Sequence, residues 1–421
     1  MKAIHVASAA ALLVGGLARH HCWGQAWAEK ECLSAVLPQE LMRYAGIEVP
    51  SRENIRVLSD AGGRYVEFRL VPGQAKKNNG IRNVRIEKLN DWPVVEAIKD
   101  SWLFASFRQR YEGRVEIDAE GRTRTVPLPN PMKEEQLHLA LSTDGRHWEP
   151  LNGNRPVWSQ WLRDPFVGRG PDGLWHLLAT GRRPASRSGQ TNLGPACLYA
   201  TSRDLLNWEN VGSLHLMQGL RDEAGRLARN IWAPEWFLDR ATGELVLLWS
   251  SSFEDAGWKR SRLWFSRTCD WQTFTPAKVL FAPPYSVIDG TLLEHGGTYY
   301  LFHKEEEFGA KTGERRAIRL ATSDRLEGPY QIHQGPLNQG QIAPVITEGP
   351  SVMPDPTKPG WLLLYDYCMS DGYGISTSSD LTNWSIEESV SLPPDARHGS
   401  ITRLTAAEAA KLRASFPNKN D

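Results

Sequence analysis

The sequence predicts an all-β protein, a five-bladed β-propeller that is closed by its C-terminal strand and preceded by an N-terminal extension. Two observations lead to this fold class. First, a strand-turn motif recurs at intervals of about 60 residues, a length that holds one four-stranded blade. Second, the chain between the copies consists of short aromatic and aliphatic runs bounded by Gly, Pro and Asp, as strands are. Because a single blade cannot bury both of its faces, the units must stack around one axis.

The recurring motif is an apolar strand, then small hydroxyl residues, then an aspartate, with an aromatic residue a few positions later. The aromatic positions are Trp148, Trp208, Phe274, Tyr330 and Trp384. We interpret the aspartates as turn residues, because they recur in every unit. They are Asp144, Asp204, Asp270, Asp324 and Asp380.

A further element recurs at the start of a strand: one residue followed by Pro or Gly. Its copies are Asp164-Pro165, Ala233-Pro234, Asp289-Gly290, Glu348-Gly349 and His398-Gly399. The first strand of a blade lines the propeller axis, so we expect the first residue of each copy to lie in one ring at a mouth of the central channel. Glu327 also precedes Gly and Pro, but it falls in the phase of an outer turn, and we interpret it as structural.

The last copy, His398-Gly399, has no further strands after it, whereas the first unit has no such copy before it. We therefore expect the C-terminal strand to complete the first blade, which closes the ring and removes an exposed sheet edge. The predicted boundaries are a signal peptide at 1–28, an extension of unclear fold at 29–98, the propeller at 99–405 and a tail at 406–421.

Charge and cysteine content exclude several kinds of partner and site. The 49 basic residues balance 49 acidic ones without a polybasic run, so we expect neither nucleic acid nor a membrane as a partner, but a neutral molecule. The five cysteines include no C-x-x-C pair, so no zinc site is indicated.

The N-terminus has the layout of a secretory signal peptide, with Lys2, a short apolar run from Val6 to Ala18, and small residues at Ala26 and Ala28. That run is too short to span a bilayer. We expect cleavage after Ala28 and a secreted or periplasmic protein. An ordinary apolar N-terminal helix is the alternative for this Ala-rich segment.

The expected ring holds three carboxylates, Asp164, Asp289 and Glu348, together with His398. Crowded like charges raise one another's pKa, and such crowding is more often functional than structural. Glycosidic bond cleavage requires two carboxylic groups that face one substrate: a neutral acid protonates the leaving oxygen, and an ionised partner activates water or attacks carbon. We interpret Glu235, one residue beyond the Ala233-Pro234 pair, as structural. The candidate substrate contacts are Trp161, Arg163, Trp232, Arg397 and His398.

The ordered motifs R-D-P, W-A-P-E, I-D-G-T, E-G-P and R-H-G-S resemble the family 43 glycoside hydrolases over roughly residues 100 to 405. The resemblance implies an inverting glycoside hydrolase that acts on furanosyl or xylosyl linkages of oligo- or polysaccharides. It also implies Asp164 as general base, Glu348 as general acid and Asp289 as the residue that tunes and orients the acid. No cofactor is required, but several members hold calcium near the axial histidine, here His398, so a structural Ca²⁺ in the central channel is a further expectation.

Two alternatives stay open. One is a noncatalytic carbohydrate-binding propeller, which the three carboxylates disfavour because binding alone needs no pKa-tuned trio. The other is a related propeller glycosidase that acts on anhydro-galactosides with histidine as proton donor. The retaining, invertase-like families share R-D-P, but their nucleophile motif N-D-P-N-G is absent from this sequence.

Overall fold

The structure is a computed structural model, and the chain divides into two compact units, residues 1–100 and 101–421. It describes residues 5–7, 55–60, 63–68, 83–85, 101–117, 123–181, 195–253, 260–307, 314–337, 340–370, 372–387 and 390–416. In the first unit, β1 (His5–Ala7) pairs antiparallel with β4 (Asn83–Arg85), and β2 (Ile55–Asp60) with β3 (Gly63–Phe68). Apart from β1, the predicted signal peptide lies outside the described residues, as does most of the predicted extension.

The second unit contains five four-stranded antiparallel sheets, which we number as blades 1 to 5. Blade 1 consists of β26 (Ala396–Leu404), β5 (Ser101–Arg110), β8 (Met132–Ser142) and β9 (Glu149–Pro150). Blade 2 consists of β10 (Leu162–Arg169), β11 (Trp175–Gly181), β12 (Cys197–Ser202) and β13 (Trp208–Leu214). Blade 3 consists of β14 (Trp232–Leu238), β15 (Leu245–Ser251), β16 (Arg262–Thr268) and β17 (Lys278–Phe281).

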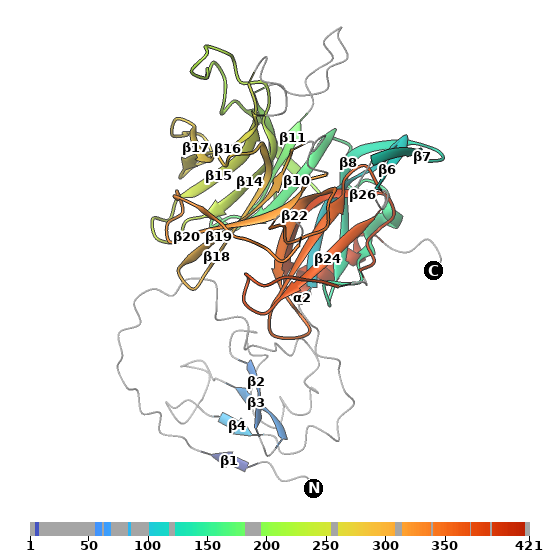
Figure 1. The fold of residues 1–421 in the computed structure, drawn as a ribbon. Helices are drawn as coiled ribbons and strands as arrows, with labels where there is room; N and C mark the ends of the chain where they lie inside the picture. Colours follow the sequence, from blue (N-terminus) through green and yellow to red (C-terminus); the bar gives the residue numbers. More distant parts are fainter. Residues whose placement is uncertain are drawn as a thin grey trace. The chain divides into compact units, whose positions relative to one another are not determined.

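Blade 4 consists of β18 (Val287–His295), β19 (Thr298–Glu305), β20 (Ala317–Ser323) and β21 (Gln331–Ile332). Blade 5 consists of β22 (Thr347–Pro354), β23 (Trp361–Tyr367), β24 (Tyr373–Ser378) and β25 (Ser385–Glu387). The first strand of each sheet contacts the first strand of the next sheet around the ring, and β26 contacts β10 (Figure 1). The predicted five-bladed propeller is confirmed, including its closure by the C-terminal strand.

Three shorter elements lie outside the sheets of the blades. The hairpin of β6 (Gly113–Ile117) and β7 (Thr123–Pro127) is inserted between β5 and β8 of blade 1. A 3₁₀ helix, Leu151–Asn154, follows β9. The helix α2 (Ala406–Ala414) occupies the segment that we expected to be a tail, and it buries Ala409 and Leu412. Within the described residues, no helix has the length and apolar character needed to cross a membrane.

The hydrophobic core lies between neighbouring blades. One cluster joins Phe104 and Trp148 of blade 1 to Met353 and Leu364 of blade 5. The side chain of Trp148 is 4 % exposed, and its Nε1 donates to the carbonyl of Gly145 in the preceding turn. The aromatic residue of the repeated motif therefore ties the outer turn to the core, which explains why the motif recurs at blade intervals.

The aspartates of the motif form turns in four of the blades. Oδ1 of Asp204, for example, accepts the backbone N–H groups of Leu206 and Asn207, at 3.0 and 2.8 Å. Asp144, Asp270 and Asp380 bond in the same pattern. Asp324 differs, because its side chain is 91 % exposed and lies 4.0 Å from Arg325. In the same turn, Glu327 pairs with Arg267 at 2.9 Å on an outer edge, as its phase in the repeat indicates.

Candidate active site

Each innermost strand carries a β-bulge near its start. The pairing with the second strand skips two residues in every blade: 164–165, 233–234, 289–290, 349–350 and 398–399. A bulge bends the strand and re-aims its side chains, and it is common beside active sites. In four blades the repeated dipeptide of the sequence is therefore the bulge, and the bulges lie at the same end of all five inner strands.

The register corrects one position of the sequence alignment. Gly349, rather than Glu348, is the bulge residue that corresponds to Asp164 and Asp289. The backbone agrees, because φ is positive at Asp164 (49°), Ala233 (42°), Asp289 (52°) and Gly349 (58°). Glu348 is the last residue paired before the bulge, directly opposite Asp366 of β23.

A repeated hydrogen bond holds three of the five bulges in place. The N–H of Ala233 donates to Thr180 Oγ1, and that of Asp289 donates to Ser250 Oγ, both at 2.9 Å. The N–H of His398 donates to Asp366 Oδ2 at 3.1 Å. Each acceptor lies on the second strand of the preceding blade, opposite the last residue before that blade's own bulge. The acceptor on the second strand of one blade therefore orients the first bulge residue of the next blade.

His398 lies between two of the predicted catalytic carboxylates. Its Nδ1 is 3.5 Å from Oδ1 of Asp164 and 3.9 Å from Oδ2 of Asp289. Burial alone would lower the pKa of His398, but Asp289, Asp164 and Glu348 outweigh it and raise that pKa. Burial raises the pKa of Asp289, and the Glu348 carboxylate adds to the rise. The structure therefore brings Asp164, Asp289, Glu348 and His398 together at one mouth of the propeller.

Glu348 has a partner that the sequence analysis did not assign. Lys304 Nζ of β19 lies 2.9 Å from its Oε2, and the lysine side chain is 1 % exposed. Burial alone would raise the pKa of Glu348, but the Lys304 ammonium and His398 together outweigh it and hold the pKa well below its usual value. The lowered pKa favours the ionised form of Glu348 in the free protein. Lys304 and the adjacent Glu305 are both buried.

The predicted substrate contacts divide into two groups. Trp161 and Arg163 are half-buried beside Glu135: Trp161 Nε1 donates to Glu135 Oε2 at 2.8 Å, and Arg163 Nε lies 3.9 Å from Oε1. Trp232 is half-buried opposite Ser250. Arg397 differs, because its side chain is 1 % exposed and its Nη1 lies 2.6 Å from Asp366 Oδ1.

Arg397 is therefore a buried structural residue rather than one that faces a substrate. Its guanidinium also donates to the carbonyls of Gln109, Tyr367 and Ser370. These bonds use the guanidinium inside the protein and fix the Asp366 carboxylate that positions His398.

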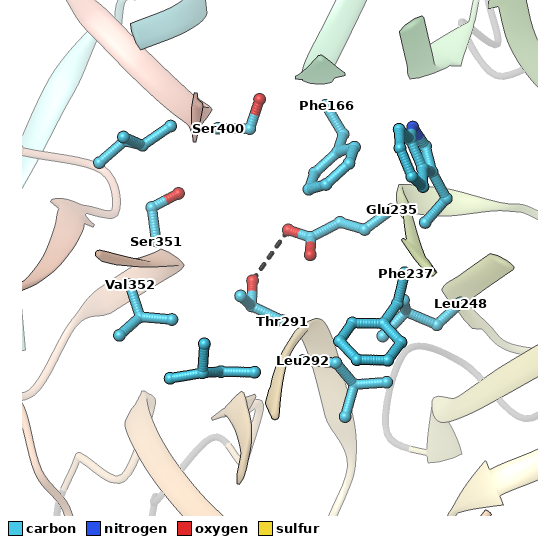
Figure 2. A pocket seen from close by; sticks show the side chains of 12 residues that line it. Phe166, Glu235, Phe237, Leu248, Thr291, Leu292, Ser351, Val352 and Ser400 are labelled. Atoms are coloured by element: carbon cyan, nitrogen blue, oxygen red, sulfur yellow. Dashed lines mark hydrogen bonds between the residues drawn. The ribbon is translucent and has the colours of Figure 1, made fainter. Parts of the chain in front are cut away.

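A cavity of about 140 Å³ lies further along the inner strands, beyond the ring. Figure 2 shows Phe166, Glu235, Thr291, Ser351 and Ser400 around it, one from each inner strand. Burial raises the pKa of Glu235 to about 8. The cavity is the central channel of the propeller, and Glu235 is a half-buried acid that lines it.

The expected calcium ion in the central channel stays a prediction. Calcium takes six to eight oxygen ligands. In the part of the chain that the structure describes, no three His, Cys, Asp or Glu side chains are arranged to hold a metal. The Nδ1 of His398 instead faces the carboxylates of Asp164 and Asp289.

Sequence reasoning missed Lys304 and Asp366. A signal for both existed, because they occupy the repeat position that Thr180 and Ser250 fill in blades 2 and 3. Aligning the second strands of the blades, as we aligned the first strands, identifies a charged residue where blades 2 and 3 carry a hydroxyl.

A family model described as "Probable glycosyl hydrolase domain", named as related to family 43, matches residues 129–410. A search of the curated proteins gives no match. Among solved structures, the chain is similar to an α-L-arabinofuranosidase from Lactobacillus brevis, with 17 % identity over 54 % of this chain and 73 % of that chain and a TM-score of 0.40.

Two further structures with similarity are a family 117 glycoside hydrolase from Zobellia galactanivorans and an endo-1,4-β-xylanase from Bacteroides thetaiotaomicron. The first has 18 % identity over 69 % of this chain and 77 % of that chain, with a TM-score of 0.41. The second has 16 % identity over 69 % of this chain and 98 % of that chain, with a TM-score of 0.43.

Proposed function

This chain belongs to the family of glycosyl hydrolase domains related to family 43, and from that membership we propose that it hydrolyses furanosyl or xylosyl linkages of oligo- or polysaccharides with inversion. The observation that carries the proposal is the convergence of Asp164, Asp289 and Glu348 around His398 at one mouth of the propeller. Family membership makes the chain a glycoside hydrolase, so the alternative of a noncatalytic binder is set aside.

In the proposed reaction, Asp164 accepts a proton from a water molecule as the water oxygen bonds to the anomeric carbon. The glycosidic C–O bond breaks, and its electron pair stays on the leaving oxygen. Glu348, protonated when the reaction begins, gives its proton to that oxygen. The attack from the face opposite the leaving group inverts the anomeric configuration. Asp289, which accepts the N–H of Gly349 at 3.3 Å, holds the backbone next to Glu348 in place.

The test is activity on a panel of nitrophenyl and oligosaccharide substrates, with proton NMR of the first product. We expect Asp164→Asn and Glu348→Gln each to lower kcat/KM by about 10²- to 10⁴-fold, the usual contribution of one general acid or base. The loss in Glu348→Gln should be largest for unactivated oligosaccharides, because a nitrophenolate leaves without protonation. A first product with retained configuration rules out the role of Asp164 as general base.

A second candidate keeps the same fold but uses another proton donor, as in the anhydro-galactoside alternative. The observation that favours it is the raised pKa of His398, which burial alone would lower but Asp289 and Asp164 raise, so that the imidazolium is a ready proton donor. In that case His398→Gln abolishes the hydrolysis of anhydro-galactosides, whereas Glu348→Gln affects activated and unactivated substrates equally.

We also propose that the protein is exported, because its first 28 residues have signal-peptide layout. N-terminal sequencing of the protein recovered from the periplasm or medium should begin at Glu29. An intact Met1 on protein retained in the cytoplasm overturns this proposal.

A further inference from the structure

Lys304 breaks the hydrogen-bond pattern that positions Ala233, Asp289 and His398. It lies opposite Ile288, the last residue before the bulge of β18, where blades 2 and 3 carry Thr180 and Ser250. Those hydroxyls accept the N–H of the next blade's bulge residue, but an ammonium has no lone pair with which to accept. The N–H of Gly349 instead donates to Asp289 Oδ2 at 3.3 Å.

The ammonium of Lys304 contacts two carboxylates inside the protein. Nζ lies 2.9 Å from Glu348 Oε2 and 2.8 Å from Glu306 Oε2, and the side chain is 1 % exposed. Its Nζ also lies 3.8 Å from the buried thiol of Cys368. Placing a buried ion pair where a hydroxyl would serve costs desolvation, and such pairs are weak evidence for a stabilising role. A functional reason for the lysine is therefore the better explanation.

We propose that Lys304 is a positioning residue for the hydrolysis: its ammonium orients Glu348, holds it as a carboxylate in the free enzyme, and thereby restricts efficient hydrolysis to acidic pH. The inference rests on the proposed function, in which Glu348 gives its proton to the leaving oxygen. Two of the three ring carboxylates are affected, since Lys304 pairs with Glu348 and leaves Asp289 as the acceptor for Gly349.

The restriction to acidic pH follows from the protonation of Glu348. A general acid works only in the fraction of molecules that carries its proton, and that fraction falls tenfold for each pH unit above the pKa. An opposite charge at hydrogen-bonding distance lowers a carboxyl pKa by about 1 to 3 units. Other titratable and charged groups also face Glu348, and Lys304 contributes the largest opposing charge. They are Tyr111, Arg163, Asp289, Asp366, Cys368, Tyr373, Arg397 and His398.

Lys304→Ser is the decisive variant, because it installs the hydroxyl that Ser250 provides at the same register position. A serine there can accept the N–H of Gly349, so the variant is compatible with the blade. We expect the descending limb of the pH profile of kcat/KM to move about 1 to 3 pH units upward. Lys304→Arg keeps a charge beside Glu348 and should keep the limb near its wild-type position. Lys278→Ser, at an exposed position of β17, is the matched control and should leave the profile unchanged.

A purely structural lysine gives a different result. In that case Lys304→Ser lowers kcat/KM by the same factor at every pH and leaves the limb in place, which overturns the proposal. If Lys304→Ser fails to fold, as judged by its thermal unfolding, the comparison of Lys304→Arg and Lys304→Met decides in the same way.

A second measurement is independent of activity. Carbon-13 NMR of protein labelled at the glutamate side-chain carboxyls follows the titration of Glu348, which is identified by the signal missing from Glu348→Gln. We expect its midpoint to lie about 1 to 3 pH units higher in Lys304→Ser than in the wild type. An unchanged midpoint overturns the role of Lys304. Full activity of Glu348→Gln with a shifted midpoint instead overturns the proposed proton donor and leaves the effect of Lys304 on Glu348 established.

Discussion

The hydroxyl of Thr291 lies 2.8 Å from Glu235 Oε1 and 2.7 Å from the carbonyl oxygen of Pro350 (Figure 2 shows the bond to Glu235). A threonine hydroxyl has one hydrogen, and a carbonyl oxygen can only accept. When Thr291 donates to Pro350, the contact with Glu235 is a hydrogen bond only if the carboxyl group donates. A protonated Glu235 therefore satisfies both contacts of the hydroxyl, in agreement with the rise in its pKa to about 8 that burial causes.

A neutral Glu235 makes the stability of the propeller depend on pH. In the unfolded chain the carboxyl releases its proton near its ordinary pKa of 4.5, whereas in the folded protein it holds the proton until about pH 8. The stabilisation that the folded protein gains by holding this proton is therefore fully present below pH 4.5 and is lost as pH rises to about 8. The side chain of Glu235→Gln is neutral at every pH. We therefore expect the unfolding free energy of this variant, relative to that of the wild type, to rise by on the order of a few kcal/mol between pH 5 and pH 8.5.

Urea unfolding of both proteins at these two pH values measures the gain. Glu244→Gln, a partly exposed glutamate on the outer edge of blade 3, serves as the control for the loss of one carboxylate. Stability curves of the Glu235→Gln variant and the wild type that stay parallel across this range contradict a neutral Glu235.

The ion pair of Arg397 and Asp366 should be costly to break from either side. Both side chains are at most 1 % exposed, and the pair has an N–O distance of 2.6 Å. Removing one partner leaves an uncompensated buried charge, so we expect Arg397→Met to lose about 3 to 5 kcal/mol of unfolding free energy. Arg325→Met is the matched control, because Arg325 is 70 % exposed and its pair with Asp324 spans 4.0 Å. Equal losses of unfolding free energy in the two variants contradict a buried structural role for Arg397.

Gly349 is the ring position where a side chain cannot be added. Its φ is +58°, and a Cβ there would lie 2.8 Å from Cγ of His398. Gly349→Ala should therefore displace the imidazole and lower kcat/KM by about tenfold or more, since small misplacements in an active site are costly. Gly297→Ala has a comparable positive φ of +80° but nothing within 4 Å, so it separates backbone strain from crowding. Equal activity of the two variants argues against crowding at His398.

The turn aspartates should differ in their effect on stability. Asp204 accepts two backbone N–H groups of its turn, whereas Asp324 is 91 % exposed. We expect Asp204→Ala to cost about 1 kcal/mol of unfolding free energy, the usual net value of a lost hydrogen bond, and Asp324→Ala almost nothing. Thermal unfolding of the two variants side by side measures the difference, and equal melting temperatures contradict the assignment.

The repeat predicted the fold because every blade of a propeller uses the same pattern of strands and turns, and this pattern recurs along the sequence. The strand lengths, the turn aspartates and the extra C-terminal strand are all local patterns, and the ring closure follows from their count. The convergence of Asp164 and Asp289 could be predicted for the same reason, because each begins a bulge in an inner strand.

The position of Glu348 was harder to predict, because Glu-Gly-Pro contains two dipeptides that fit the pattern. Only the hydrogen-bond ladder, which skips Gly349 and Pro350, decides between them. The roles of Lys304 and Arg397 were also beyond the sequence. A long cationic side chain at a strand end is usually solvated, and only tertiary packing turns these two toward Glu348 and Asp366.

The helix α2 should contribute to stability well beyond its length. It begins with a capping box of Thr405 and Glu408, and it buries Leu412 against blades 1 and 2 directly after the strand that closes the ring. Leu412→Ala removes a buried side chain that is 3 % exposed, so we expect a loss of about 2 to 5 kcal/mol. Lys411→Ala, one residue earlier and exposed, is the matched control and should change stability by less than about 0.5 kcal/mol. A cooperative transition at lower urea concentration for Leu412→Ala alone is the expected result, whereas coincident transitions of the two variants contradict the docking of α2 on the core.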